Sequence, residues 1–212
     1  MPRKESGKKG RFIVFEGIDG SGKNTQSNLL YDVLCAKGRK CLLTSEPSGG
    51  EIGVFAREEL GRRLGGIDMR TLQFLFMADR SDHVERVIKP NLSQGIDVIS
   101  SRYFYSTVVY GAAFGSRFAM DMKWLLEANT LFPKPDVVFF IDVPPEVGYE
   151  NVKRRAGKKE RFEELGDLKL TCEYYRKLSR KVSGTRWIRI NGNRPRAVVA
   201  KSITKEFEEL GL

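Results

Sequence analysis

The chain has 212 residues, of which 41% are hydrophobic and 30% are charged, which suits one domain with a single sizeable core. Its longest apolar run, Val137–Ile141, is too short to cross a bilayer, and no apolar stretch follows the basic N-terminus, so we expect neither a membrane span nor a signal peptide. The formal net charge of +10 gathers in residues 1–11 and 151–161 and not in a spread stripe, which argues against nucleic-acid binding.

Short apolar runs alternate with segments of helical periodicity along the chain. In chain order, the pattern first predicts a strand at Arg11–Glu16, a helix at Gly22–Ala36, a strand at Lys40–Ser45, helices at Ile52–Leu64 and Met69–Ile88, and a strand at Asp97–Ser101. It then predicts a helix at 119–130, a strand at Asp136–Val143, helices at Pro145–Arg155 and Glu163–Val182, a strand at Arg186–Asn191 and a helix at Pro195–Leu210. Pro90 is expected to end the helix before it.

Strands that alternate with helices favour an α/β fold built on a parallel sheet. We predict a doubly wound, five-stranded parallel sheet with helices on both faces, in a single domain over residues 11–212. Residues 1–10 contain Gly, Ser and several basic residues and are expected to form a flexible tail. The second basic cluster, near residues 153–162, is too local for a duplex and suits one small polyanion.

The cysteine and histidine content narrows the chemistry further. Cys35, Cys41 and Cys172 are odd in number and do not have the spacing of a metal site, which predicts reduced thiols in a cytoplasmic protein. A single histidine, His83, makes zinc chemistry and Ser-His-Asp hydrolysis poor explanations of function.

Residues 17–23 fit the pattern G-x-x-x-x-G-K between the first predicted strand and the first predicted helix. Glycines let consecutive backbone N–H groups point at a phosphate, and the helix adds its positive N-terminal end. Lys23 would bridge the β- and γ-phosphates of a nucleotide. The pattern predicts a P-loop NTPase-type fold in which ATP contacts Gly17, Ile18, Asp19, Gly20, Ser21, Gly22, Lys23, Asn24 and Thr25.

Five motifs then fall in order along the chain: FEGIDGSGKNTQ, SEP, FLFMADR, SRYFYSTVVY and PDVVFFIDVPPE. Together they resemble the thymidylate kinase family, whose members transfer a phosphoryl group from ATP to dTMP. The resemblance extends from Arg11 to the end of the chain. It implies ATP and dTMP as substrates, Mg²⁺ as the cofactor and a homodimeric assembly.

The resemblance also implies an acceptor site. Arg57 and Arg102 would bind the monophosphate, since a planar guanidinium suits two-point phosphate contact. Phe76 would stack on thymine, and Arg80, four residues later on the same helix face, would donate to a base carbonyl. The remaining members of the site would be Thr107 beside the base, Tyr110 at the sugar 2′ side, Asp19 at the 3′-hydroxyl and Glu46 in the same crevice. For Glu46 an equal alternative is a cap on the following helix.

Phosphoryl transfer depends more on alignment of the two substrates and neutralisation of their charge than on covalent catalysis by the protein. Lys23, Arg102 and Asp19 are the catalytic candidates within the core of the site. The basic residues near 153–162 resemble the lid of the family, which supplies an arginine to the transferred group. Arg155 and Arg161 are both candidates for that arginine, and the sequence does not choose between them.

Two positions depart from the expected pattern. Asn24 stands where a P-loop has Ser or Thr as a magnesium ligand, although an amide oxygen also suits a hard cation. Ser101 stands where the family has the aspartate of Asp-Arg-Tyr. Asn24 and Asp19 are the candidate metal ligands, and Glu46 and Asp142 lie near enough in the predicted fold to contribute.

Three interpretations follow from these departures. The first is an active thymidylate kinase with a rearranged metal site. The second is a kinase of the same fold for another monophosphate such as dUMP, UMP or CMP. The third is a nucleotide-binding protein with impaired catalysis, against which the retained Lys23, Arg102 and basic lid argue.

Overall fold

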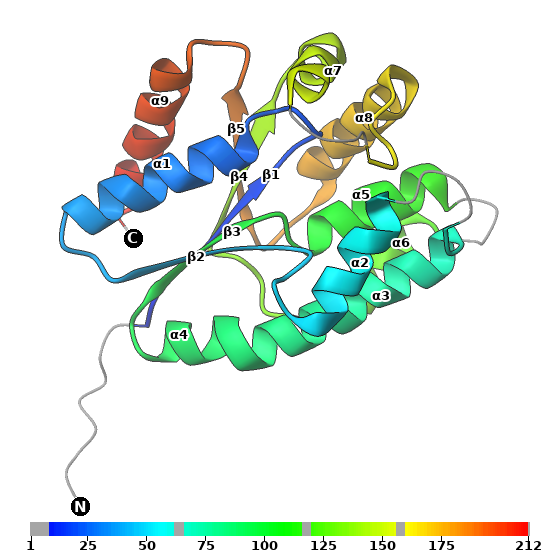
Figure 1. The fold of residues 1–212 in the computed structure, drawn as a ribbon. Helices are drawn as coiled ribbons and strands as arrows, with labels where there is room; N and C mark the ends of the chain where they lie inside the picture. The colour runs from blue at the N-terminus through cyan, green and yellow to red at the C-terminus, as the bar shows by residue number, and fades with distance from the viewer. Residues whose placement is uncertain (1–8, 62–65, 116–119, 156–159, 212) are drawn as a thin grey trace, which may run out of the picture.

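The structure is a computed structural model that describes residues 9–61, 66–115, 120–155 and 160–211. These residues form one parallel sheet with the strand order β2-β3-β1-β4-β5 (Figure 1). The five strands are β1 (Phe12–Glu16), β2 (Cys41–Ser45), β3 (Asp97–Ser101), β4 (Val137–Asp142) and β5 (Arg186–Asn191). Each lies within one residue of its predicted bounds, and the predicted doubly wound five-stranded α/β fold is confirmed.

The two faces of the sheet bury alternate residues of the same strands. Ile13 and Phe15 of β1 face α1 (Lys23–Ala36) and α9 (Arg196–Glu209), which lie side by side in Figure 1. Phe12 and Val14 face the opposite way, into a core shared with the helices of the other side. Strands covered on both faces read as continuous apolar runs, as they do here.

The described residues form seven further α-helices: α2 (Glu51–Gly61), α3 (Met69–His83), α4 (Lys89–Ser93), α5 (Phe104–Phe114), α6 (Met122–Ala128), α7 (Pro145–Arg154) and α8 (Leu165–Lys181). The bounds of α1, α7, α8 and α9 fall within two residues of those predicted. The predicted ends of two helices, at 62–64 and at 119, lie outside the described residues. No helix in the described ranges has the length and apolar character needed to cross a bilayer.

The prediction that Pro90 ends the preceding helix is wrong. After α3 the chain widens into a π-helix, η1 (Val84–Ile88), and then continues as α4, with Pro90 in the first turn of α4. Lys89 N bonds to Val84 O across the wide turn. A proline lacks an N–H donor and is tolerated in a first turn, so the local rewinding lets the helical path pass it.

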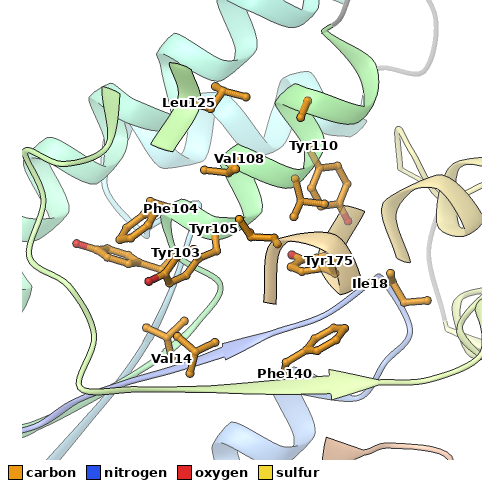
Figure 2. Packing of buried hydrophobic residues seen from close by; sticks show 14 of the residues in the cluster. Val14, Ile18, Tyr103, Phe104, Tyr105, Val108, Tyr110, Leu125, Phe140 and Tyr175 are labelled. Atoms are coloured by element: carbon orange, nitrogen blue, oxygen red, sulfur yellow. The ribbon is translucent and has the colours of Figure 1, made fainter. Parts of the chain in front are cut away.

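Helix α5 was not predicted. Its residues, rich in β-branched and aromatic side chains, favour strands by local propensity. The helix forms because it is buried on nearly every side, between α3, α6 and α8. Figure 2 shows Tyr105, Val108 and Tyr110 of α5 in this core, with Tyr175 of α8 beside them. A helix that is apolar all round gives no amphipathic signal.

The predicted tail over residues 1–10 lies mostly outside the described residues, since 1–8 are not described. Its last residue, Gly10, is packed: the residue is buried, and its N–H donates to Leu92 O at 2.8 Å. A β-carbon at Gly10 would lie 2.0 Å from Ile96 O, so only glycine fits this approach to the start of β3.

Candidate active site

The phosphate loop joins β1 to α1 at the carboxyl edge of the sheet. Gly17, Gly20 and Gly22 all have positive φ values, of 150°, 75° and 89°. A β-carbon on Gly20 would lie 2.0 Å from the carbonyl oxygen of Gly148 on α7, so this approach requires glycine as well. The loop leads directly into the first turn of α1, whose N–H groups have no partners within the helix. The arrangement suits an anion.

Lys23 lies beneath this loop. Its side chain is 7% exposed, and Nζ donates to Ile18 O at 3.2 Å and to Asp19 Oδ1 at 3.3 Å. Burial, and then the charge of Arg102, lowers the pKa of Lys23 to about 8, against the opposing effect of Asp19. The lysine is therefore held close to the loop that it is predicted to serve.

Asp19 and Arg102 form an ion pair that joins the phosphate loop to the end of β3. Tyr110 donates its hydroxyl to the other carboxylate oxygen of Asp19 at 2.7 Å. Burial alone would raise the pKa of Asp19, but the charges of Arg102 and Lys23 hold it well below its usual value. The carboxylate is ionised and fixed between three partners.

The guanidinium of Arg102 is positioned by backbone and side chains together. Arg102 has a φ of 70°, in the left-handed region that a non-glycine residue seldom adopts. Its Nη1 donates to Ser106 Oγ at 2.9 Å and to Tyr175 Oη at 3.2 Å. Strained backbone of this kind is found where the surrounding structure fixes a functional side chain.

A buried carboxylate, Glu16, organises that surrounding structure. It is fully buried and accepts from Tyr103 N at 3.0 Å, Ser106 N at 3.3 Å, Ser106 Oγ at 2.7 Å and Tyr175 Oη at 2.8 Å. Burial raises the pKa of Glu16, while the charge of Arg102 and these hydrogen bonds act against that rise. Glu16 thus connects β1, α5 and α8 around Arg102.

A cavity with an empty volume of about 780 Å³, counted to its open mouth, lies beside the phosphate loop. All eight residues predicted to bind the acceptor substrate line it: Asp19, Glu46, Arg57, Phe76, Arg80, Arg102, Thr107 and Tyr110. They come from the phosphate loop, the β2–α2 loop, α2, α3 and the β3–α5 segment. The structure therefore brings together residues that are up to 91 positions apart.

Arg80 forms the buried floor of the cavity. Its Nε donates to Glu46 Oε2 at 2.8 Å, Nη1 to Asn129 Oδ1 at 2.8 Å and Nη2 to Thr107 Oγ1 at 2.9 Å. Glu46 also contacts His83 Nδ1 at 3.3 Å. Of the two alternatives for Glu46, the structure has its carboxylate on Arg80 within the crevice and not at the start of α2.

Arg57 reaches the cavity from α2 and bonds to the loop after β2. Nη1 donates to Ser48 O at 2.7 Å, and Nη2 donates to Pro47 O. That loop is in turn tied to α3, because Ser48 N donates to Asp79 Oδ2 at 2.7 Å. Phe76, half-buried, stands on α3 and lines the cavity with one turn of helix between it and Arg80.

The two arginines predicted for the lid lie in different places. Arg161 lines the cavity, and its Nη1 donates to Ile67 O at 2.9 Å. Arg155 has a half-exposed side chain whose Nη2 donates to the buried Glu163 at 2.8 Å. Residues 156–159 of the predicted lid lie outside the described residues. Phe162, which sequence reasoning missed, stacks on Phe114 with ring centroids 4.5 Å apart at the cavity wall.

The candidate metal ligands differ in availability. Asp19 is paired with Arg102 and Lys23, Glu46 with Arg80, and Asp142 with Arg176 and Arg189. In the part of the chain that the structure describes, no three His, Cys, Asp or Glu residues group as a metal site. Asn24 is exposed at the start of α1, and its amide oxygen accepts a hydrogen bond from Ser101 Oγ at the end of β3.

Several residues of the site carried no usable signal in the sequence. Tyr175 lies on α8, 159 positions from the Glu16 that it binds, and looks like an ordinary aromatic of an amphipathic helix. Asn129 and Phe162 are likewise brought in by tertiary packing. Glu16 and Ser106 do stand within the quoted motifs, and a polar residue at the end of a buried strand would have indicated Glu16.

The sheet is parallel, a glycine loop precedes α1, Lys23 is buried, and an arginine-lined cavity lies where the strand order reverses between β1 and β3. Together these features define a P-loop fold of the nucleoside monophosphate kinase type. The solved structure of thymidylate kinase from Candida albicans superposes with a TM-score of 0.82 at 24% identity and covers 96% of this chain and 93% of that chain, which shows the fold.

Sequence comparison identifies the family within this class. The thymidylate kinase family model matches residues 15–203. A thymidylate kinase of Dinoroseobacter shibae is 42% identical over 202 residues, which cover 92% of this chain and 94% of that protein. A probable thymidylate kinase of Pyrococcus horikoshii is 40% identical over 164 residues, which cover 76% and 78%. The chain belongs to the thymidylate kinase family.

Proposed function

We propose that the protein transfers the γ-phosphoryl group of ATP to dTMP and releases dTDP and ADP. The observation that carries this proposal is the cavity beside the phosphate loop, which all eight predicted acceptor residues line. Family membership supports the same reaction. Two polyanions must be held in line for phosphoryl transfer, and the Asp19–Arg102 ion pair joins the two halves of such a site.

The donor half consists of residues 17–25 and Lys23. Backbone N–H groups of the loop and the first turn of α1 bind the phosphates, and Lys23 supplies a positive charge to the β- and γ-oxygens. Arg155 and Arg161 bring further positive charge from the predicted lid, Arg161 from the wall of the acceptor cavity. Because the transferred group gains no covalent partner from the protein, catalysis rests on this charge and on alignment.

The acceptor half binds the nucleoside monophosphate. Arg102 and Arg57 hold its phosphate, Phe76 stacks on the base, and Arg80 with Thr107 donates to base oxygens. Tyr110 stands beside Asp19, so its ring would meet a ribose 2′-hydroxyl while Asp19 accepts from the 3′-hydroxyl. This arrangement supports selection of deoxyribose over ribose.

Magnesium accompanies ATP in this proposal. Mg²⁺ keeps several waters and binds substrate phosphates together with one or two protein oxygens, and Asn24 and Asp19 would supply such oxygens at the loop. When bound, the ion neutralises charge on the phosphates. The residues present fit such a partly hydrated ion better than an all-protein site.

We further propose the setting in which the enzyme works. Residues 11–212 act as one domain whose lid spans about 153–162, after a basic tail at 1–10. A homodimer is supported by the family and by large apolar side chains exposed on neighbouring helices, Phe55 on α2, Phe74 on α3 and Trp124 on α6. A cytoplasmic location is supported by three free cysteines.

The test is a coupled ADP-release assay with ATP and Mg²⁺, in which dTMP, dUMP, UMP, CMP and AMP are offered in parallel. Turnover should be highest on dTMP and should fall about 100-fold or more in Arg102→Ala, which loses the guanidinium at the phosphate. Preference for another monophosphate would overturn the roles of Phe76, Arg80 and Thr107. Retained ATP binding without turnover on any acceptor would favour a nucleotide-binding protein.

A further inference from the structure

Asn24 and Ser101, the two residues that depart from the expected motifs, contact each other. Ser101 Oγ donates a hydrogen bond to Asn24 Oδ1 at 2.5 Å, although 77 positions separate them in the sequence. Two unrelated departures have no reason to be complementary. These two pair a hydroxyl donor with an amide acceptor, which is a matched combination.

The position of Ser101 is fixed by the sheet. It is the last residue of β3, and its carbonyl accepts from Glu46 N at 3.0 Å. The next residue, Arg102, donates its N–H to Phe15 O at 2.8 Å. Ser101 is also 5% exposed. Its hydroxyl is therefore presented to α1 from a rigid strand end.

Asn24 is the second residue of α1 and follows Lys23. Its amide oxygen has two lone pairs, of which Ser101 uses one, so the second is left for another partner. A free amide can turn over and exchange its oxygen and nitrogen ends. In this structure the Ser101 hydroxyl donates to the oxygen end, so Oδ1 and not the amide nitrogen faces Ser101.

We propose that Ser101 is a positioning residue that orients the Asn24 amide, so that Asn24 Oδ1 is a protein oxygen offered to the Mg²⁺ that arrives with ATP. This inference rests on the proposed ATP-dependent function. The expected motifs would have a hydroxyl donor on α1 at position 24 and a carboxylate acceptor on β3 at position 101. Here the acceptor, Asn24, is on α1 and the donor, Ser101, is on β3, and neither side chain is charged. The nearby carboxylates of Asp19, Glu46 and Asp142 are engaged by arginines.

The test measures ATP binding by calorimetry without dTMP, once with Mg²⁺ and once with EDTA, so that no turnover contributes. The readout is the ratio of the Kd in EDTA to the Kd in Mg²⁺. Asn24→Ala, Ser101→Ala and the double variant should each lower this ratio by the same factor, about tenfold, as expected for one shared interaction. In Ser101→Ala, which leaves the residues of the ATP site in place, the Kd in EDTA should not change.

Two further variants serve as controls. Ser101→Thr keeps a hydroxyl and should keep the wild-type ratio. Ser27→Ala removes another buried hydroxyl of α1, one that donates to the Asn24 backbone carbonyl at 2.9 Å, and should also keep it. If Ser27→Ala lowered the ratio of the two Kd values as much as Ser101→Ala does, the effect would come from a general disturbance of α1, and the inference would be wrong.

Other outcomes would also overturn it. They are a wild-type ratio of one, an unchanged ratio in Ser101→Ala, and a double variant that loses the product of the two single losses. The proposed function fails separately, through the absence of turnover on dTMP. If the ratios of Kd values change as expected but the protein does not turn over dTMP, the role of the Asn24–Ser101 pair is supported and the assignment of dTMP as acceptor is wrong.

Discussion

Removal of Lys23 should make the protein more stable and unable to bind ATP tightly. The side chain is 7% exposed, and burial lowers its pKa from 10.5 to about 8. One pKa unit corresponds to about 1.4 kcal/mol, so the charged lysine costs the fold about 3 kcal/mol at neutral pH. Lys23→Met keeps the length and removes the charge, and Asp19 retains Arg102 and Tyr110 as partners. The free energy of unfolding should rise by up to that amount.

The gain should depend on pH with a definite sign. As pH rises through 8, folded wild-type protein loses the Lys23 proton, whereas the unfolded chain keeps it until about 10.5. The unfolded state therefore binds more protons in this window, and wild-type stability increases with pH across it. The variant has no such group. The difference in stability between variant and wild type should be largest at pH 7 and should close by about pH 10.5.

The assay is thermal unfolding of both proteins without nucleotide at pH 7 and pH 10, with ATP binding followed by calorimetry. For a chain of this length, the gain at pH 7 corresponds to a Tm increase of about 10 °C. Lys37→Met is the control, since Lys37 is half-exposed and pairs with Glu208 at the surface. A lower Tm for Lys23→Met at pH 7, or the same difference at both pH values, would refute the reasoning.

Three further predictions concern the acceptor and the lid. Tyr110→Phe loses the hydroxyl that donates to Asp19 and should lower kcat/KM for dTMP about tenfold, yet its ring should preserve the preference for dUMP over UMP in the same assay. Phe76→Ala should raise the KM for dTMP about tenfold and leave the KM for ATP unchanged; equal effects on both would exclude a role at the base. Arg161→Ala, at the cavity, should chiefly raise the KM for dTMP, whereas Arg155→Ala, outside it, should chiefly lower kcat; the reverse pattern in steady-state kinetics would exchange their roles.

Local patterns predict most of this fold. The strands are short, apolar and bounded by turns, and the glycine loop lies between a strand and a helix, so both are visible along the chain. Helix α5 is invisible because burial on all sides overrides strand propensity. The sequence pattern also does not predict the π-helix η1 before Pro90, because this local widening only accommodates the N–H group that Pro90 lacks.

The site divides in the same way. Residues within ordered motifs, such as Phe76 and Arg102, could be nominated from the sequence, and the structure gathers them around one cavity, while their roles stay predictions. Glu16 and Tyr175 act through hydrogen bonds between distant segments, which leave no periodic trace. The Asn24–Ser101 contact was equally hidden, because each residue looks like an isolated departure until the fold joins them.

The two segments that we propose bind phosphates follow adjacent strands, and this placement has a mechanical consequence. The phosphate loop follows β1 and Arg102 follows β3, and these strands are paired along Phe12–Phe15 and Val98–Ser101. Neighbouring strands are about 4.8 Å apart, a spacing that backbone hydrogen bonds hold nearly constant. In the proposed function, the hydrogen bonds between these two strands therefore set the distance between the donor and acceptor phosphates.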